Sequence, residues 1–239
     1  MNRRLHSILR GIKRTITRAT RRPRVGHVPS ERLLSTTPVS RKFGLDRGTP
    51  VDRVYIEHFL ESNADAIRGR VLEIADDTYT RRFGNSLESV DILHVNRDNP
   101  RATIVADLSD APQIEDESFD CVVLTQTLQF ILDVPAAIAT LHRVLRPMGA
   151  ILATVSSITQ VSQYDMVRWG DYWRFTEASI GALVKNRFGS HTVTVKSYGN
   201  LLTAIALLHG LAAEELPEEQ LAYCDPIYPV IIGVRATKE

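Results

Sequence analysis

Acidic, amide and hydroxyl side chains stand at the ends of several short apolar runs in this sequence. Carboxylate, amide and hydroxyl groups can hold the hydroxyl and amine groups of a small polar ligand. In a parallel sheet, such ligands bind at the carboxyl ends of the strands. We therefore expect one crevice to be lined by Ala75 to Thr80, Asn96, Asp107, and Thr125 to Gln129.

The apolar runs are short and enriched in β-branched residues, which is typical of buried strands. The expected strands are residues 71–74, 90–95, 102–107, 119–128, 150–155, 191–197 and 228–236. Apolar residues at helical spacing predict helices over residues 51–67, 134–147, 177–186 and 200–216. This alternation predicts an α/β protein whose sheet is mostly parallel, with helices on both faces and an antiparallel strand at the edge.

The composition suits one soluble domain of moderate size with added segments. The chain has 239 residues, of which 44% are hydrophobic and 24% charged, and it has two cysteines without CxxC spacing. No apolar run approaches the roughly 20 residues of a membrane-spanning helix. We expect a basic arm over residues 1–24, a linker or lid over 25–50, and one domain over 51–239.

The charged residues are distributed unevenly along the chain. Residues 1–24 hold nine Arg or Lys and no Asp or Glu, so the arm carries +9 and the remainder −8. Apolar residues at helical spacing between these charges would let the arm lie on an anionic membrane surface. A flexible basic tail fits the composition equally well, and so does an organelle transit peptide. We expect no nucleic-acid partner, because no aromatic residue interleaves the charges.

Five segments together resemble class I S-adenosylmethionine-dependent methyltransferases, from about residue 41 to the C-terminus. They are VLEIADD (71–77), VADL (105–108), FDCVVLTQTLQFI (119–131), LHRVLRPMGAILATV (141–155) and DYWRFT (171–176). The last part of the chain is similar to methyltransferases associated with glycosyltransferases of bacterial surface polysaccharides and glycolipids. The resemblance implies a Rossmann-like, seven-stranded sheet and S-adenosylmethionine as the cofactor.

The resemblance also implies positions for the cofactor. The methionine part would lie against Glu73 and the turn holding Ala75, Asp76 and Tyr79. Asn96 would contact the ribose, Asp107 and Leu108 the adenine, and Thr125 and Gln126 the sulfonium. The family normally has alternating glycines after the acidic residue, where this chain has Ala75, Asp77 and Tyr79. We expect the cofactor to bind despite this difference.

A sugar hydroxyl is a poor nucleophile, so methyl transfer to it calls for a general base. The candidates are Asp133, His142, Asp171 and His209. We favour Asp171, which stands among aromatic residues suited to a sugar ring, and name His209 second, although a histidine in an apolar helix is commonly a core residue. We expect no metal, because the acidic residues are not spaced as a known metal site.

The sequence therefore predicts an O-methyltransferase acting on a sugar or glycolipid acceptor. A methyltransferase for another small metabolite or a lipid acid is an alternative, and so is a catalytically idle scaffold. We expect a cytoplasmic protein that the basic arm can bring to the inner membrane face. The sequence predicts neither the acceptor nor the oligomeric state.

Overall fold

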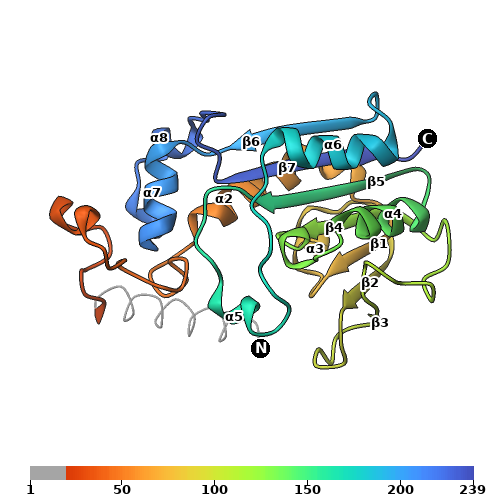
Figure 1. Cartoon of the computed structure of the whole chain (residues 1–239), viewed down its shortest axis with the longest axis horizontal. Coiled ribbons are helices and arrows are strands. Elements are labelled where there is room, and N and C mark those ends of the chain that lie inside the picture. Colours follow the sequence, from red (N-terminus) through yellow and green to blue (C-terminus); the bar gives the residue numbers. More distant parts are fainter. Residues whose placement is uncertain (1–19) are drawn as a thin grey trace. The chain divides into compact units, whose positions relative to one another are not determined.

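The computed structural model describes residues 20–239 (Figure 1). Most of the predicted basic arm therefore lies outside the described residues. The strands are β1 (Gly69–Ile74), β2 (Leu87–His94), β3 (Ile104–Val105), β4 (Phe119–Thr125), β5 (Leu145–Ser156), β6 (Val193–Tyr198) and β7 (Ile231–Thr237). The α-helices are α2 (Val51–Ser62), α3 (Thr78–Phe83), α4 (Val134–Val144), α5 (Gln163–Met166), α6 (Glu177–Phe188), α7 (Leu201–His209) and α8 (Glu218–Ala222). Short 3-10 helices are η1 (Ser30–Leu34), η2 (Ala64–Ala66), η3 (Leu128–Phe130) and η4 (Ala213–Glu215).

The strands form one seven-stranded sheet in the order β3-β2-β1-β4-β5-β7-β6. Strands β1 to β5 pair in parallel, and β7 runs antiparallel to both of its neighbours, β5 and β6. The predicted fold class is confirmed. The antiparallel strand lies second from the edge, and β6 forms the edge itself.

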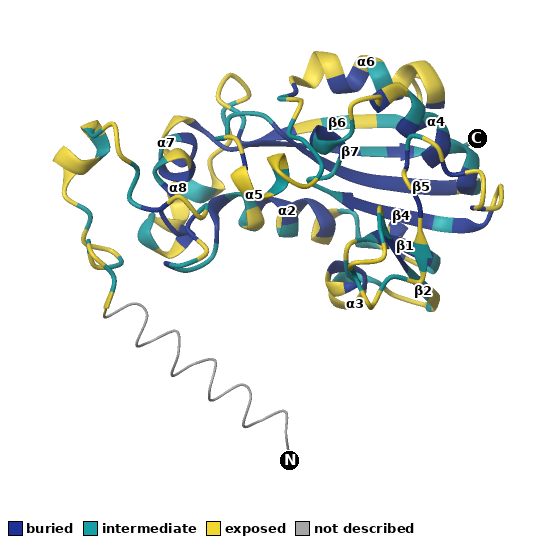
Figure 2. Cartoon of the chain, turned by 60° about the horizontal axis from the view of Figure 1, so that its bottom comes forward, coloured by how far each residue is buried: buried dark blue, intermediate teal, exposed yellow. Residues whose placement is uncertain are grey.

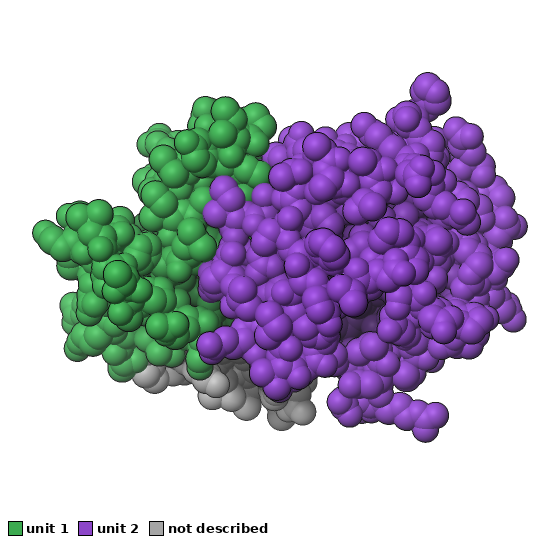
Figure 3. Space-filling view, in the orientation of Figure 1, with its two compact units in different colours: residues 1–55, 199–230 green, residues 56–198, 231–239 purple. Residues whose placement is uncertain are grey.

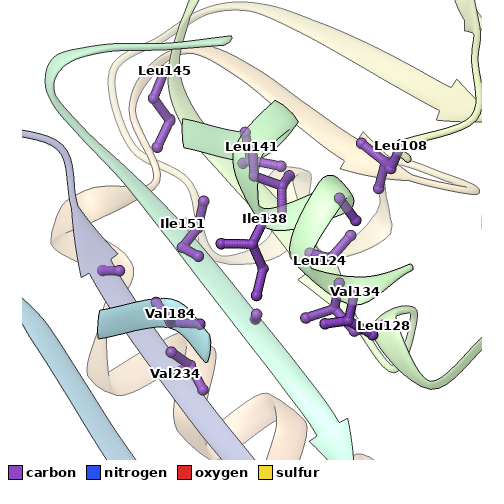
Figure 4. Packing of buried hydrophobic residues seen from close by; sticks show 14 of the residues in the cluster. Leu108, Leu124, Leu128, Val134, Ile138, Leu141, Leu145, Ile151, Val184 and Val234 are labelled. Carbon is purple, nitrogen blue, oxygen red and sulfur yellow. The ribbon is translucent and has the colours of Figure 1, made fainter. Parts of the chain in front are cut away.

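Helices cover both faces of the sheet. Successive side chains of a strand point to opposite faces, so Ile232 and Val234 face one side of β7 and Gly233 faces the other. Ile232 and Val234 belong to the core cluster that α4 and α6 complete, which Figure 4 shows from close by. A side chain at Gly233 would collide with Phe59 of α2. Helices α4 and α6 therefore cover one face, and α2 lies on the other.

Several predicted boundaries are wrong for local physical reasons. The helix predicted over residues 200–216 ends at His209, because Gly210 adopts a left-handed conformation (φ 67°) and its N–H bonds back to the last turn. A side chain at Gly210 would also strike the Ser40 carbonyl. Helix α4 ends at Val144 rather than Pro147, and β5 begins at Leu145. Strand β3 has two residues where six were expected.

The described chain divides into two compact units (Figure 3). Unit 1 consists of the described part of residues 1–55 together with residues 199–230, and unit 2 consists of residues 56–198 and 231–239. This division differs from the predicted boundary at residue 50, because the segment around α7 and α8 folds with residues 20–55. No helix within residues 20–239 combines the length and apolarity needed to cross a membrane.

Candidate functional site

A buried carboxylate organises the turn after β1. Glu73 is 2% exposed, and its two oxygens accept separate hydrogen bonds from the backbone N–H groups of Tyr79 (3.1 Å) and Thr80 (2.7 Å). Burial raises the pKa of Glu73, and the hydrogen bonds from Thr80 and Tyr79 offset part of this rise. Glu73 therefore fixes the start of α3 relative to β1, which sets the path of the turn.

The turn keeps a glycine-like backbone without glycine. Ala75 has φ 71°, a left-handed conformation that non-glycine residues seldom adopt, and its carbonyl accepts a hydrogen bond from Asn99 Nδ2 (2.6 Å). Asp76 Oδ1 accepts from the N–H of Thr78 (2.8 Å). Ala75 is exposed as a residue, while its backbone N–H donates to the Leu93 carbonyl (2.9 Å).

Side chains at the other two glycine positions are buried. The carboxylate of Asp77 forms ion pairs with Arg81 of α3 and Arg101 of the loop after β2. Burial alone would raise the pKa of Asp77, but the hydrogen bonds from the two arginines outweigh it and lower the pKa. The ring of Tyr79 stacks on Phe83. Both side chains are therefore held by partners on α3 or on the loop after β2.

The three residues predicted to bind the cofactor after β2 and β3 have different surroundings. Asn96 is engaged within its own loop, because its side chain both donates to and accepts from Asp98. Asp107 is exposed, and its Oδ1 accepts from Ser109. The side chain of Leu108 is 3% exposed and packs in the core (Figure 4), and the position of this residue beside the adenine stays a prediction.

An uncharged polar cluster lies at the ends of β4 and β5. Gln129 Nε2 donates to Gln126 Oε1 and Ser156 Oγ, both at 3.0 Å, and the Ser156 hydroxyl donates to Gln126 Oε1 (2.5 Å). Gln126 has φ 49°, and its N–H bonds to the Thr154 carbonyl (2.8 Å). Gln129 Oε1 is buried and has no hydrogen-bond partner among the described residues. The cluster thus offers an unused acceptor beside Thr125 and Gln126.

A long loop crosses the strand ends. Residues 157–175, here called the crevice loop, leave β5 and carry α5 (Figure 1). The ring of Trp169 meets the ring of His94, the last residue of β2, edge to face at 5.5 Å. Two strands, β4 and β1, separate β5 from β2. The crevice loop must therefore pass over the carboxyl ends of β4 and β1.

The crevice loop is also tied to the segment after β4. The N–H groups of Tyr172 and Trp173 donate to the Gln129 carbonyl, and Trp173 Nε1 donates to the Ile131 carbonyl (3.0 Å). The sequence analysis did not identify the contacts of His94, Arg101 and Trp169. The sequence offered one signal for His94, which is its position near the end of a predicted strand, where ligand-binding residues gather.

The comparisons with known proteins agree with this arrangement. Residues 68–153 match a family model described as a methyltransferase domain. The chain has the fold of a class I S-adenosylmethionine-dependent methyltransferase. No curated protein matched the sequence.

Three solved structures illustrate this methyltransferase fold. A putative sarcosine dimethylglycine methyltransferase from Galdieria sulphuraria is 14% identical, with a TM-score of 0.53 over 80% of this chain and 90% of that chain. An S-adenosylmethionine-dependent methyltransferase from Mesorhizobium loti is 17% identical, with a TM-score of 0.53 over 79% and 100%. Another S-adenosylmethionine-dependent methyltransferase, from Archaeoglobus fulgidus, is 10% identical, with a TM-score of 0.51 over 78% of this chain and 94% of that chain.

S-adenosylmethionine is the cofactor that this methyltransferase fold implies, and it would lie at the turn after β1. Ala75, whose backbone is left-handed, is exposed, while the side chains of Asp77 and Tyr79 are buried elsewhere. Asp107, which is exposed, follows β3, and the half-buried Thr125 ends β4, with β2 and β1 lying between these two strands. These residues fit a nucleoside with a charged side chain laid across the carboxyl ends of β1, β3 and β4.

The two predicted bases belong to different units of the described chain. Asp171 accepts from both Nη groups of Arg174 and from the N–H of Ser162, and its side chain is 1% exposed. Burial alone would raise its pKa, but these hydrogen bonds outweigh burial and lower the pKa. His209 lies in unit 1, with Nε2 3.0 Å from the Leu33 carbonyl. These contacts show that Asp171 holds the crevice loop, and its role as the general base stays a prediction.

Proposed function

We propose that this chain is an S-adenosylmethionine-dependent O-methyltransferase that acts on a sugar hydroxyl of a glycolipid or surface-polysaccharide precursor. The observation that carries the proposal is the crevice loop, which passes over the strand ends and carries exposed aromatic side chains. Tyr164, Tyr172 and Trp173 are 63%, 48% and 41% exposed. Large apolar surfaces left exposed beside a crevice are typical of ligand-binding sites.

The uncharged cluster at β4 and β5 supports a neutral acceptor. Gln126, Gln129 and Ser156 offer amide and hydroxyl groups but no charge. Gln129 Oε1 has no hydrogen-bond partner among the described residues but is buried, so an acceptor hydroxyl or amine would bond to it only after the neighbouring side chains move. A carboxylate acceptor has no proton to donate at neutral pH and would leave this oxygen unpaired, at a cost of about 1–3 kcal/mol.

The cofactor supplies an electrophilic methyl group on a sulfonium sulfur. The acceptor hydroxyl oxygen would bond to the methyl carbon while the carbon–sulfur bond breaks, leaving its electron pair on sulfur, and a general base at the site would accept the hydroxyl proton. The task of the chain is then to align the acceptor and to exclude bulk water. The Trp169–His94 contact and the backbone bonds to Gln129 hold the crevice loop in place for this task.

A two-step experiment tests the proposal. Calorimetry with S-adenosylmethionine and S-adenosylhomocysteine measures cofactor binding first, and a screen with a labelled methyl donor then compares glycolipids, soluble sugars and lipid carboxylic acids. We expect binding of both nucleosides and label in sugar hydroxyls. Label in lipid acids would overturn the choice of acceptor but keep the enzyme.

A second candidate function is a methyltransferase-like scaffold without activity. The buried Asp77 and Tyr79 at the usual glycine positions favour it, because such side chains restrict the turn. No detectable binding of either nucleoside would support the scaffold and overturn the enzymatic proposal.

A further inference from the structure

Helix α7 of unit 1 exposes an apolar face. Leu201, Leu202 and Leu208 are 52%, 36% and 41% exposed, and Ile205 is half-buried (Figure 2). Leu201, Ile205 and Leu208 follow one another at spacings of four and three residues and so share one side of the helix. The buried side of α7 consists of Thr203, Ala204, Ala206 and Leu207. An exposed helix face made of leucine and isoleucine is unusual for a helix facing water.

Exposed basic residues surround the C-terminal end of this face. His209 Nε2 lies 3.0 Å from the Leu33 carbonyl, which places Leu34, itself 88% exposed, beside the end of α7. The N–H groups of Val39 and Ser40 both donate to the His209 carbonyl. The basic residues that adjoin these contacts, all exposed, are Arg32, Arg41 and Lys42.

The basic arm is anchored to the same unit. Arg47 and Glu215 form an ion pair at 2.6 Å in which each side chain is 2% exposed. Arg47 Nη1 also donates to the Pro23 carbonyl (2.9 Å), and Glu215 Oε1 accepts from the N–H of Gly26 (3.0 Å). The arm of residues 1–24, with nine basic and no acidic residues, thus begins from a fixed point on unit 1.

The two ends of α7 differ in charge. At its N-terminal end, Asn200 Nδ2 donates to the Gln220 carbonyl in α8, whose first turn carries Glu218 and Glu219. An anionic surface would attract the end around Arg41 and Lys42 more strongly than the end near Glu218 and Glu219, so the C-terminal end of α7 would lie closer to the bilayer. An apolar stripe with a basic border matches the headgroup region of an anionic bilayer.

We propose that the exposed face of α7 is a membrane-docking surface. Leu201, Ile205 and Leu208 enter the boundary between headgroups and acyl chains, while Arg32, Arg41 and Lys42 contact the lipid phosphates. The basic arm adds electrostatic attraction, and the α7 face supplies the apolar part of the binding. Two such signals together are what stable attachment to a bilayer requires.

Cosedimentation of the full chain with vesicles tests this surface. The vesicles contain phosphatidylcholine alone or phosphatidylcholine mixed with phosphatidylglycerol. We expect the native chain to bind the anionic vesicles, and a Leu201→Glu/Leu208→Glu variant to bind them about tenfold or more weakly. Met148→Glu is the matched control, because Met148 is 74% exposed at the amino end of β5 and should bind like the native chain.

Two outcomes would overturn the docking surface. One is equal binding of the native chain and the α7 variant, because the arm alone would then account for attachment. The other is a native dimer in sedimentation velocity that the α7 variant abolishes, because the face would then bind a second copy. Unchanged thermal unfolding of the variant shows that it is folded.

A second measurement keeps the test valid if the glutamate variant misfolds. Cys121 is buried and Cys224 is exposed, so a Leu208→Cys variant in a Cys224→Ser background accepts an environment-sensitive fluorophore at α7. We expect a blue shift in its emission with anionic vesicles and none with phosphatidylcholine alone. An emission spectrum that anionic vesicles leave unchanged would contradict the proposal.

Discussion

At the scale of single residues, the left-handed backbone of Ala75 gives the turn after β1 a conformation that is usual for glycine. A non-glycine residue in the left-handed region destabilises the folded chain by about 1–2 kcal/mol. Glycine avoids this cost, but it makes the unfolded chain more flexible, which lowers the stability by about 0.4–1 kcal/mol. Ala75→Gly should therefore raise the stability slightly and preserve cofactor affinity. Ala75→Val should lower both, because a β-branched residue resists φ 71°. Thermal unfolding and cofactor titration measure these effects, and a glycine variant less stable than the native chain would contradict the account.

Glu73 gives a second prediction at this scale, based on its two oxygens. Glutamine has one carbonyl oxygen, so it cannot accept from both Tyr79 and Thr80. Glu73→Gln should cost about 1–3 kcal/mol of stability at neutral pH. Asp76→Asn is a suitable control, because its single bond to Thr78 needs one oxygen. Denaturant unfolding of the two variants measures the difference.

The raised pKa of Glu73 also predicts a pH dependence. The folded chain holds this proton more tightly than the unfolded chain, so the stability that Glu73 contributes falls as the pH rises from the ordinary pKa of glutamate through the raised one. Glutamine does not titrate. The stability difference between the native chain and Glu73→Gln should therefore shrink as the pH rises through this window. A constant difference would show that Glu73 does not titrate differently in the folded state.

At the scale of elements, the crevice loop depends on the Asp171–Arg174 pair. Arg174 also donates to the carbonyl oxygens of Gln160 (2.8 Å) and Trp173 (2.7 Å), so it joins both ends of the loop. Asp171→Asn and Arg174→Gln should each increase hydrogen exchange in residues 157–175. The double variant should be little worse than either, with a coupling of about 1–3 kcal/mol.

Methyl transfer separates this structural role from a catalytic one. If Asp171 positions the loop, both single variants should lower turnover by similar factors and leave cofactor affinity nearly unchanged. A general base would make Asp171→Asn far more damaging than Arg174→Gln, and that result would restore the base first predicted from the sequence. The pKa of Asp171 is lowered in the folded chain. The stability that Asp171 gives to the crevice loop should therefore decline as the pH falls through this lowered pKa.

At the scale of the whole molecule, the buried Arg47–Glu215 pair holds unit 1 together. Removing one partner from a buried pair leaves an uncompensated charge and costs about 3–5 kcal/mol. Arg47→Met should therefore increase hydrogen exchange in residues 20–55 and 199–230, with a smaller effect in residues 56–198. An Arg47→Met/Glu215→Leu double variant should recover much of the loss. Equal exchange increases in both units would contradict the division of the chain.

Local pattern predicted most of the sheet. The run AILATV (150–155) is mostly apolar on both sides, and its short length and β-branched residues favour a strand that is covered on both faces. The spacing of apolar residues in α4 likewise predicted a helix. Boundaries were less predictable, because Gly210 ends α7 partly through the close approach of Ser40, a residue far away in the sequence.

The sequence by itself determined the fold class and the edge of the sheet where a ligand can bind, because both follow from hydrophobic periodicity and from the direction of parallel strands. The tertiary structure decided what each polar residue does there. Asp171 faces Arg174, Leu108 enters the core, and Trp169 reaches His94 across two strands. Such roles depend on partners distant in the chain, and a side chain's hydrogen bonds and burial are known only when those partners are in place.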